Sequence, residues 1–147
     1  MDQALAGWEP TPEDAFTALV TMIPTMNEYF EQWKLSVFVS GQASTQENFV
    51  AVSRLLDITG ILNGLDVTYD NIKPTVTQTN PALSNQIDSG LDTLVAYVND
   101  LYQQEQQGKQ FTPEDADMLG SKAQDDATAL AGQIAQAAAL LNVEIAE

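Results

Sequence analysis

The chain has 147 residues, 44% of them hydrophobic, and its 21 acidic residues against five basic ones give a net charge of −16. Such an acidic surface repels phosphate backbones and anionic lipid, so it excludes nucleic acid as a partner, and no stretch approaches the roughly 18–20 apolar residues of a membrane span. Cysteine and histidine are absent, which excludes disulfides, thiolate metal sites and histidine-based catalysis. We predict one helical domain over residues 1–147. The charge indicates solubility, or attraction of cations or a basic partner.

The first predicted helix spans residues 12–39 and begins at the string TPEDA, which occurs at residues 11–15 and again at 112–116. Threonine suits the cap position, proline the first helical position, and the two acidic residues favour the positive end of the helix dipole. Its apolar residues recur at steps of three and four, at Phe16, Leu19, Ile23, Met26, Phe30, Trp33 and Val37. We expect a kink at Pro24, inside this stripe, and an end near Gly41.

Three further helices follow by the same signals. The second, residues 45–73, begins at the Ser44 cap with Glu47 three residues on, and Lys73-Pro74 is expected to end or kink it. The third, residues 81–107, begins at Asn80-Pro81 and stops before Gly108. The fourth, residues 113–143, begins at the second TPEDA. The apolar stripes of these helices are Leu55, Ile58, Leu62, Leu65, Tyr69, Ile72 and Val76; Leu83, Ile87, Leu91, Leu94, Val98 and Leu101; and Leu119, Ala123, Ala127, Leu130, Ile134, Ala137 and Leu141. Short connections between amphipathic helices predict an all-α fold, an antiparallel up-down-up-down four-helix bundle.

The sequence assigns no catalytic, metal-binding or cofactor-binding residue. A di-iron bundle site needs Glu-x-x-His pairs, which a chain without histidine lacks. The pairs Asp66/Asp70 and Asp88/Asp92 each place two carboxylates on one helical face, where a hard cation could bind, but an acidic solvated face is the favoured interpretation. The four lysines (Lys34, Lys73, Lys109 and Lys122) have no Ser-x-x-Lys context that would indicate a nucleophile. We therefore expect no enzymatic activity and no cofactor.

Two classes of aromatic residue are expected. Phe30, Trp33 and Tyr69 lie on the stripes, so we predict that they pack in the core. Trp8 precedes the first helix and lies on no stripe; it is interpreted as a lid on the end of the bundle, or as a contact to a partner.

The runs TNPALSNQIDSGLDTLVAYVNDLY (79–102) and FTPEDADMLGSKAQDDATALAGQIAQAAALLNV (111–143) resemble the C-terminal half of imelysin-like proteins, and in particular the EfeO-type periplasmic component of bacterial iron uptake. The family has two helical-bundle halves, and its metal-linked His-x-x-Glu motif belongs to the first. Acidic residues that the second half commonly supplies are replaced here by Gln42, Ala43 and Ser44. The resemblance thus implies kinship without the metal site.

The expected function is a non-enzymatic, extracytoplasmic binding module related to imelysin-like and iron-uptake proteins. The resemblance implies the periplasm or cell envelope, with the cytoplasm left open, and a partner that is either a protein or an N-terminal bundle half absent from this chain. The alternative is a ligand-sensing or scaffold bundle of a larger receptor or envelope protein. A carboxylate-based hydrolase is a third and remote hypothesis.

Overall fold

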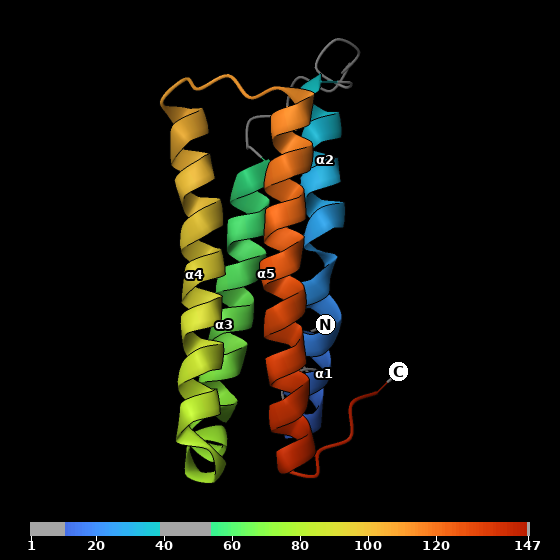
Figure 1. The fold of residues 1–147 in the computed structure, drawn as a ribbon, viewed down its shortest axis with the longest axis vertical. Helices are drawn as coiled ribbons and strands as arrows, with labels where there is room; N and C mark the ends of the chain where they lie inside the picture. The colour runs from blue at the N-terminus through green and yellow to red at the C-terminus, as the bar shows by residue number, and fades with distance from the viewer. Residues whose placement is uncertain (1–10, 39–53, 147) are drawn as a thin grey trace, which may run out of the picture.

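Four helical rods, packed side by side, form the part of the chain that the computed structural model describes, residues 11–38 and 54–146 (Figure 1). The first rod consists of α1 (Pro12–Met22), a 3₁₀ turn (Ile23–Thr25) and α2 (Met26–Phe38); the others are α3 (Arg54–Thr79), α4 (Pro81–Gln106) and α5 (Pro113–Leu140). No strand occurs in these ranges, which confirms the all-α class. The expectations for Trp8, Gly41, the Gln42–Ser44 stretch and the start of the second helix lie outside the described residues.

Each rod contacts its neighbours along a common core. α3 packs against α4, while α5 contacts α1, α2 and α4, and α1 and α2 both contact α3. Figure 1 shows α3 and α4 running in opposite directions, with Asn80 as the single residue between them. None of the described helices combines the length and the apolar character that crossing a membrane requires.

Both copies of the repeated string are helix starts, as predicted, and both form complete capping boxes. The Thr11 hydroxyl accepts a hydrogen bond from the Asp14 N–H at 3.2 Å, and the Asp14 carboxylate accepts one from the Thr11 N–H at 2.9 Å. Thr112 and Asp115 repeat this exchange at 3.1 Å and 2.9 Å. At the first helix start, the hydrogen bonds that Asp14 accepts from Thr11, with the backbone N–H as the largest cause, hold the pKa of Asp14 below its ordinary value. The repeat is therefore one local solution used twice.

Two left-handed residues end the last two helices. Gly108 has φ +91°, as its predicted role requires, and the Lys109 N–H bonds back to the Gln104 carbonyl at 3.0 Å. Asn142 has φ 54°, and the Val143 N–H bonds to the Ala138 carbonyl at 2.9 Å. The fourth helix thus ends at Leu140 and not at the predicted residue 143, because asparagine here takes the place that glycine usually fills.

Of the two outcomes predicted for Lys73-Pro74, an end or a kink, the end at residue 73 is wrong, since α3 continues through Pro74 to Thr79. Proline removes one backbone donor, but the extra turns bury Val76, which is 1% exposed. The Thr77 hydroxyl also bonds to the Lys73 carbonyl at 2.8 Å and lies 2.8 Å from the Ser84 hydroxyl of α4. These contacts offset the missing hydrogen bond.

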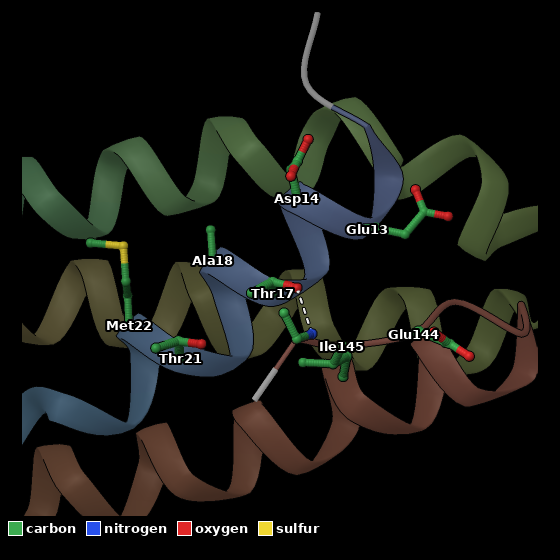
Figure 2. Close-up of a pocket in the computed structure, with 9 residues that line it drawn as sticks. Glu13, Asp14, Thr17, Ala18, Thr21, Met22, Glu144 and Ile145 are labelled. Atoms are coloured by element: carbon green, nitrogen blue, oxygen red, sulfur yellow. Dashed lines mark hydrogen bonds between the residues drawn. The ribbon is translucent and has the colours of Figure 1, made fainter.

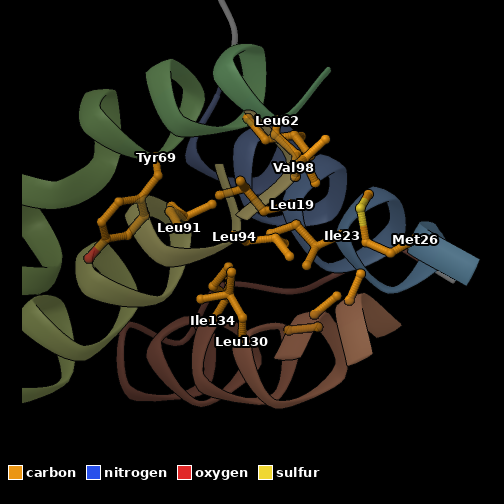
Figure 3. Close-up of a cluster of buried hydrophobic side chains, with 14 of the residues drawn as sticks. Leu19, Ile23, Met26, Leu62, Tyr69, Leu91, Leu94, Val98, Leu130 and Ile134 are labelled. Carbon is orange, nitrogen blue, oxygen red and sulfur yellow. The ribbon is translucent and has the colours of Figure 1, made fainter. Parts of the chain in front are cut away.

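The predicted stripes form the core (Figure 3). In the first three rods, every stripe residue whose side chain is described is buried. In α5 the stripe is shifted slightly, because Leu119 and Leu141 are only partly buried, while Ala116 and Gly120 are buried. Gly120 lies so close to α2 that a Cβ atom there would be 2.8 Å from the Cβ atom of Phe30. The small residue at this position sets how closely α2 and α5 approach.

We expect Gly120→Ala to lower the free energy of unfolding by about 1–3 kcal/mol, since the added methyl group meets the Phe30 side chain near its backbone. Gly132→Ala on the same helix is the matched control, because its added Cβ has no neighbour within 4 Å. That control should raise stability by about 0.5–1 kcal/mol through helix propensity. Urea unfolding measures both, and an equal gain for the two variants would contradict the close approach of α2 and α5.

Candidate functional site

Two hollows flank α1. The first, here named the α1–tail hollow, lies between α1 and residues 144–146 and has a volume of about 580 Å³ (Figure 2). The second, the α1–α3 hollow, has a volume of about 340 Å³. Both fall within the size range of small-molecule sites. Their linings share Asp14 and Ala18, so α1 forms a wall of each.

Carboxylate, hydroxyl and apolar side chains all line the α1–tail hollow. The Thr17 hydroxyl accepts a hydrogen bond from the Ala146 N–H at 3.2 Å, which joins the C-terminal segment to α1 (Figure 2). Met22 contributes a thioether side chain that is 37% exposed. The complete lining is Glu13, Asp14, Thr17, Ala18, Thr21, Met22, Glu144, Ile145 and Ala146. It contains three acidic side chains and no basic one, so the hollow suits a ligand that carries positive charge.

The basic residues of the chain are all engaged elsewhere. The ion pairs with aspartate are Lys34–Asp117 at 2.7 Å, Lys73–Asp88 at 2.6 Å, Lys122–Asp126 at 2.6 Å and Arg54–Asp57 at 3.1 Å. Lys109 donates to the Gln104 side chain at 2.6 Å and lies 4.9 Å from the centre of the Phe111 ring. None of these five side chains lines either hollow, so within the described ranges no basic side chain neutralises the carboxylates there.

The two predicted aspartate pairs are close enough to influence one another. Burial raises the pKa of Asp66 above its ordinary value, and the charges of Asp70, Asp92 and Asp88 raise it further. The positive charge of Lys73, which pairs with Asp88 at 2.6 Å, acts in the opposite direction and lowers the pKa of Asp66 in part. Within the described ranges no group of three or more acidic, histidine or cysteine side chains is placed to hold a metal ion. The structure thus brings the pairs into a common electrostatic field across α3 and α4, which spacing within each helix did not predict.

The aromatic residues predicted for the core are buried there. Trp33 contacts Phe30 edge-on, with ring centres 5.9 Å apart, and its indole N–H donates to the Glu105 carboxylate at 2.9 Å. The Tyr69 hydroxyl donates to the Ser84 carbonyl at 3.2 Å. These polar ends are all hydrogen-bonded, as buried aromatic residues require. They hold the bundle together and are not accessible to a ligand.

A partly buried phenol, that of Tyr97, was not singled out by the sequence analysis. The Tyr97 hydroxyl donates to the Leu119 carbonyl at 3.1 Å, and burial raises the pKa of Tyr97 to about 12. The phenol therefore stays protonated at neutral pH and fixes α4 against α5.

Asp66→Asn should raise the free energy of unfolding at neutral pH. Because the pKa of Asp66 is raised in the folded state from its ordinary value of 3.8, the charged carboxylate costs stability at neutral pH. This cost disappears as the pH falls from neutral toward the ordinary value of 3.8 and the carboxyl group takes up a proton, so the advantage of the variant should shrink over that interval.

Asp125→Asn is the matched control, since it removes one exposed charge from α5, away from this cluster. Urea unfolding across the pH range measures both variants. A destabilised Asp66→Asn protein at neutral pH, or a gain no larger than that of the control, would contradict the repulsion.

Comparison with known protein families gives a match over most of the chain. The family model described as Imelysin (Peptidase M75) matches residues 1–137. No curated protein and no solved structure matches. The matched range extends over nearly all of the chain and confirms the family resemblance carried by the third and fourth helices, so this protein belongs to the imelysin family.

Proposed function

We propose that this imelysin-family protein is a non-enzymatic, extracytoplasmic binding module that holds a positively charged ligand in the α1–tail hollow. The observation that carries the proposal is the lining of this hollow, which has three acidic side chains, two threonine hydroxyls and no base. The position of the five basic side chains supports it, because all of them are engaged away from the hollow. Opposite charge in a concave site raises the local concentration of such a ligand.

We also infer the antiparallel up-down-up-down order of the rods. The one-residue connection at Asn80 and the short connection at residues 107–112 support it, since such links join neighbouring helices of opposite direction. In this arrangement α1 and the C-terminal segment lie at the same end of the bundle, where the hollow forms.

The absence of enzymatic activity is proposed from the residue types of the chain. Neither histidine nor cysteine occurs anywhere in the sequence, so the commonest general base and the thiol nucleophile are unavailable. Each of the four lysines pairs with an aspartate or glutamine side chain of the chain itself. We infer that the peptidase name of the family does not describe the activity of this chain.

Kinship with EfeO-type iron-uptake proteins leads us to propose an envelope location, but without a tight metal site. Gln42, Ala43 and Ser44 supply no carboxylate where the resemblance places acidic ligands. Calorimetric titration with Fe³⁺, Cu²⁺, Zn²⁺ and Ca²⁺ is expected to show no stoichiometric site tighter than about 10 μM, equivalent to about −7 kcal/mol. A tight one-to-one site for any of these ions would overturn this part of the proposal.

A short peptide of alternating lysine and alanine tests the ligand class. It should bind the native protein more tightly than a peptide in which glutamate replaces lysine, and the affinity should fall as salt is raised. The double variant Glu13→Gln/Glu144→Gln removes two of the three carboxylates of the hollow and should weaken binding at least ~5-fold.

The matched control is Glu28→Gln/Asp125→Asn, which makes the same change in net charge at two exposed residues that line neither hollow. Isothermal calorimetry measures the affinities. Equal weakening by the two double variants would mean that the peptide responds to overall charge, and would contradict a site at the hollow.

A further inference from the structure

The first rod is interrupted where α1 meets α2. Residues Ile23–Thr25 form a 3₁₀ turn, and Pro24 has no N–H, so the helical bond to the Val20 carbonyl is missing. The Thr25 hydroxyl donates to the carbonyl of Met22, the last residue of α1, at 2.6 Å, and so joins the turn to α1 only. The backbone alone therefore joins α1 to α2 through fewer hydrogen bonds than a continuous helix would have.

A side chain from α5 occupies this interruption. The Gln124 side-chain oxygen accepts a hydrogen bond from the Asn27 N–H at 2.8 Å, and its side-chain nitrogen donates to the Pro24 carbonyl at 2.7 Å. The same nitrogen lies 3.1 Å from the Thr128 hydroxyl. One amide group thus pairs with a donor and an acceptor of the backbone at the join, which are groups that a regular helix would satisfy by itself.

The two halves of the first rod are held unequally. α2 approaches α5 closely at Gly120 and is tied to it by the Lys34–Asp117 ion pair. α1 has a hollow on each side, and its contact with the C-terminal segment includes one hydrogen bond, from Ala146 to Thr17. Ala15, Phe16 and Leu19 are the buried residues that hold α1 on the core.

We propose that α1 is a hinged cover on the bundle, that it pivots at Ile23–Thr25, and that the hydrogen bonds of Gln124 to Pro24 and Asn27 hold this pivot in the closed position. Movement of α1 changes both hollows at once, because α1 is a wall of each. This inference rests on the proposed function in one respect, namely that the α1–tail hollow is where the ligand binds. The closed position is the dominant state, since opening uncovers Phe16 and Leu19.

The alternative is that Gln124 only completes the hydrogen bonding of a rigid rod. In that case α1 and α2 open together, and loss of the Gln124 hydrogen bonds destabilises the whole bundle. Native-state amide exchange separates the two cases, because it reports the opening of each segment independently.

The experiment is hydrogen–deuterium exchange by mass spectrometry on the full chain, with Gln124→Leu as the test variant. We expect amides of α1 to exchange faster than those of α2 in the native protein. In Gln124→Leu, exchange of α1 should rise about tenfold or more through loss of two hydrogen bonds, while the α3–α4 hairpin changes less than twofold. Gln133→Leu is the control on the same helix, since Gln133 lines the groove between α4 and α5 and should leave α1 unchanged.

Gln124→Glu is a second variant that keeps the acceptor for Asn27 and loses the donor to Pro24 at neutral pH, so its α1 exchange should lie between those of the native and leucine forms. Equal exchange of α1 and α2 in the native protein, or uniform acceleration of all helices in both Gln124 variants, would overturn the hinge. The measurement needs no ligand, so failure of the hinge and failure of the lysine-peptide binding can be told apart.

Discussion

The whole arrangement depends on the burial of one apolar stripe from each rod in a common core. A fully buried leucine or phenylalanine stabilises a fold by about 1.5–3 kcal/mol, whereas the net charge of −16 opposes compaction through self-repulsion. Leu19, Leu62 and Leu91 come from three different rods and are all fully buried in this core (Figure 3). Removal of the stripes from water is therefore what keeps a strongly acidic chain folded, and it also fixes which side chains remain at the surface.

The acidic residues play opposite parts in different places. At the starts of α1 and α5, Asp14 and Asp115 accept backbone hydrogen bonds, and their pKa values are lowered. Along α3 and α4, burial and neighbouring carboxylates raise the pKa of Asp66, so negative charge is unfavourable there. At the α1–tail hollow, Glu13 and Glu144 share the lining with the Asp14 carboxylate, and no basic side chain lines it. Local geometry, and not the total charge, decides whether a carboxylate stabilises the fold, strains it, or is available to a ligand.

Sequence reasoning found the features that depend on neighbours in the chain. Capping strings, apolar periodicity and Gly108 are local signals, and the structure confirms them because each is satisfied within one or two helical turns. The path of α3 through Pro74 was missed, because the contacts of Val76 and Thr77 that offset the lost donor involve other helices. Gln124 was missed for the same reason, since its bond to Pro24 joins residues 100 apart in the sequence. The α1–tail hollow could not be predicted either, as it depends on where residues 144–146 return against α1.

Gly120 and Gln124 of α5 contact the first rod in different ways, one at α2 and one at the interruption between α1 and α2. They are four residues apart on α5, and therefore lie one above the other on the same face. Gly120 admits Phe30 of α2 at close range, which leaves no room for relative movement on that side. One turn further along, Gln124 meets the interruption at Pro24 with reversible hydrogen bonds instead of packed side chains. Beyond that point α1 passes between two hollows. Rigid packing on one side of the join and hydrogen bonding at the join itself restrict any movement to α1, the half of the rod that borders the candidate site.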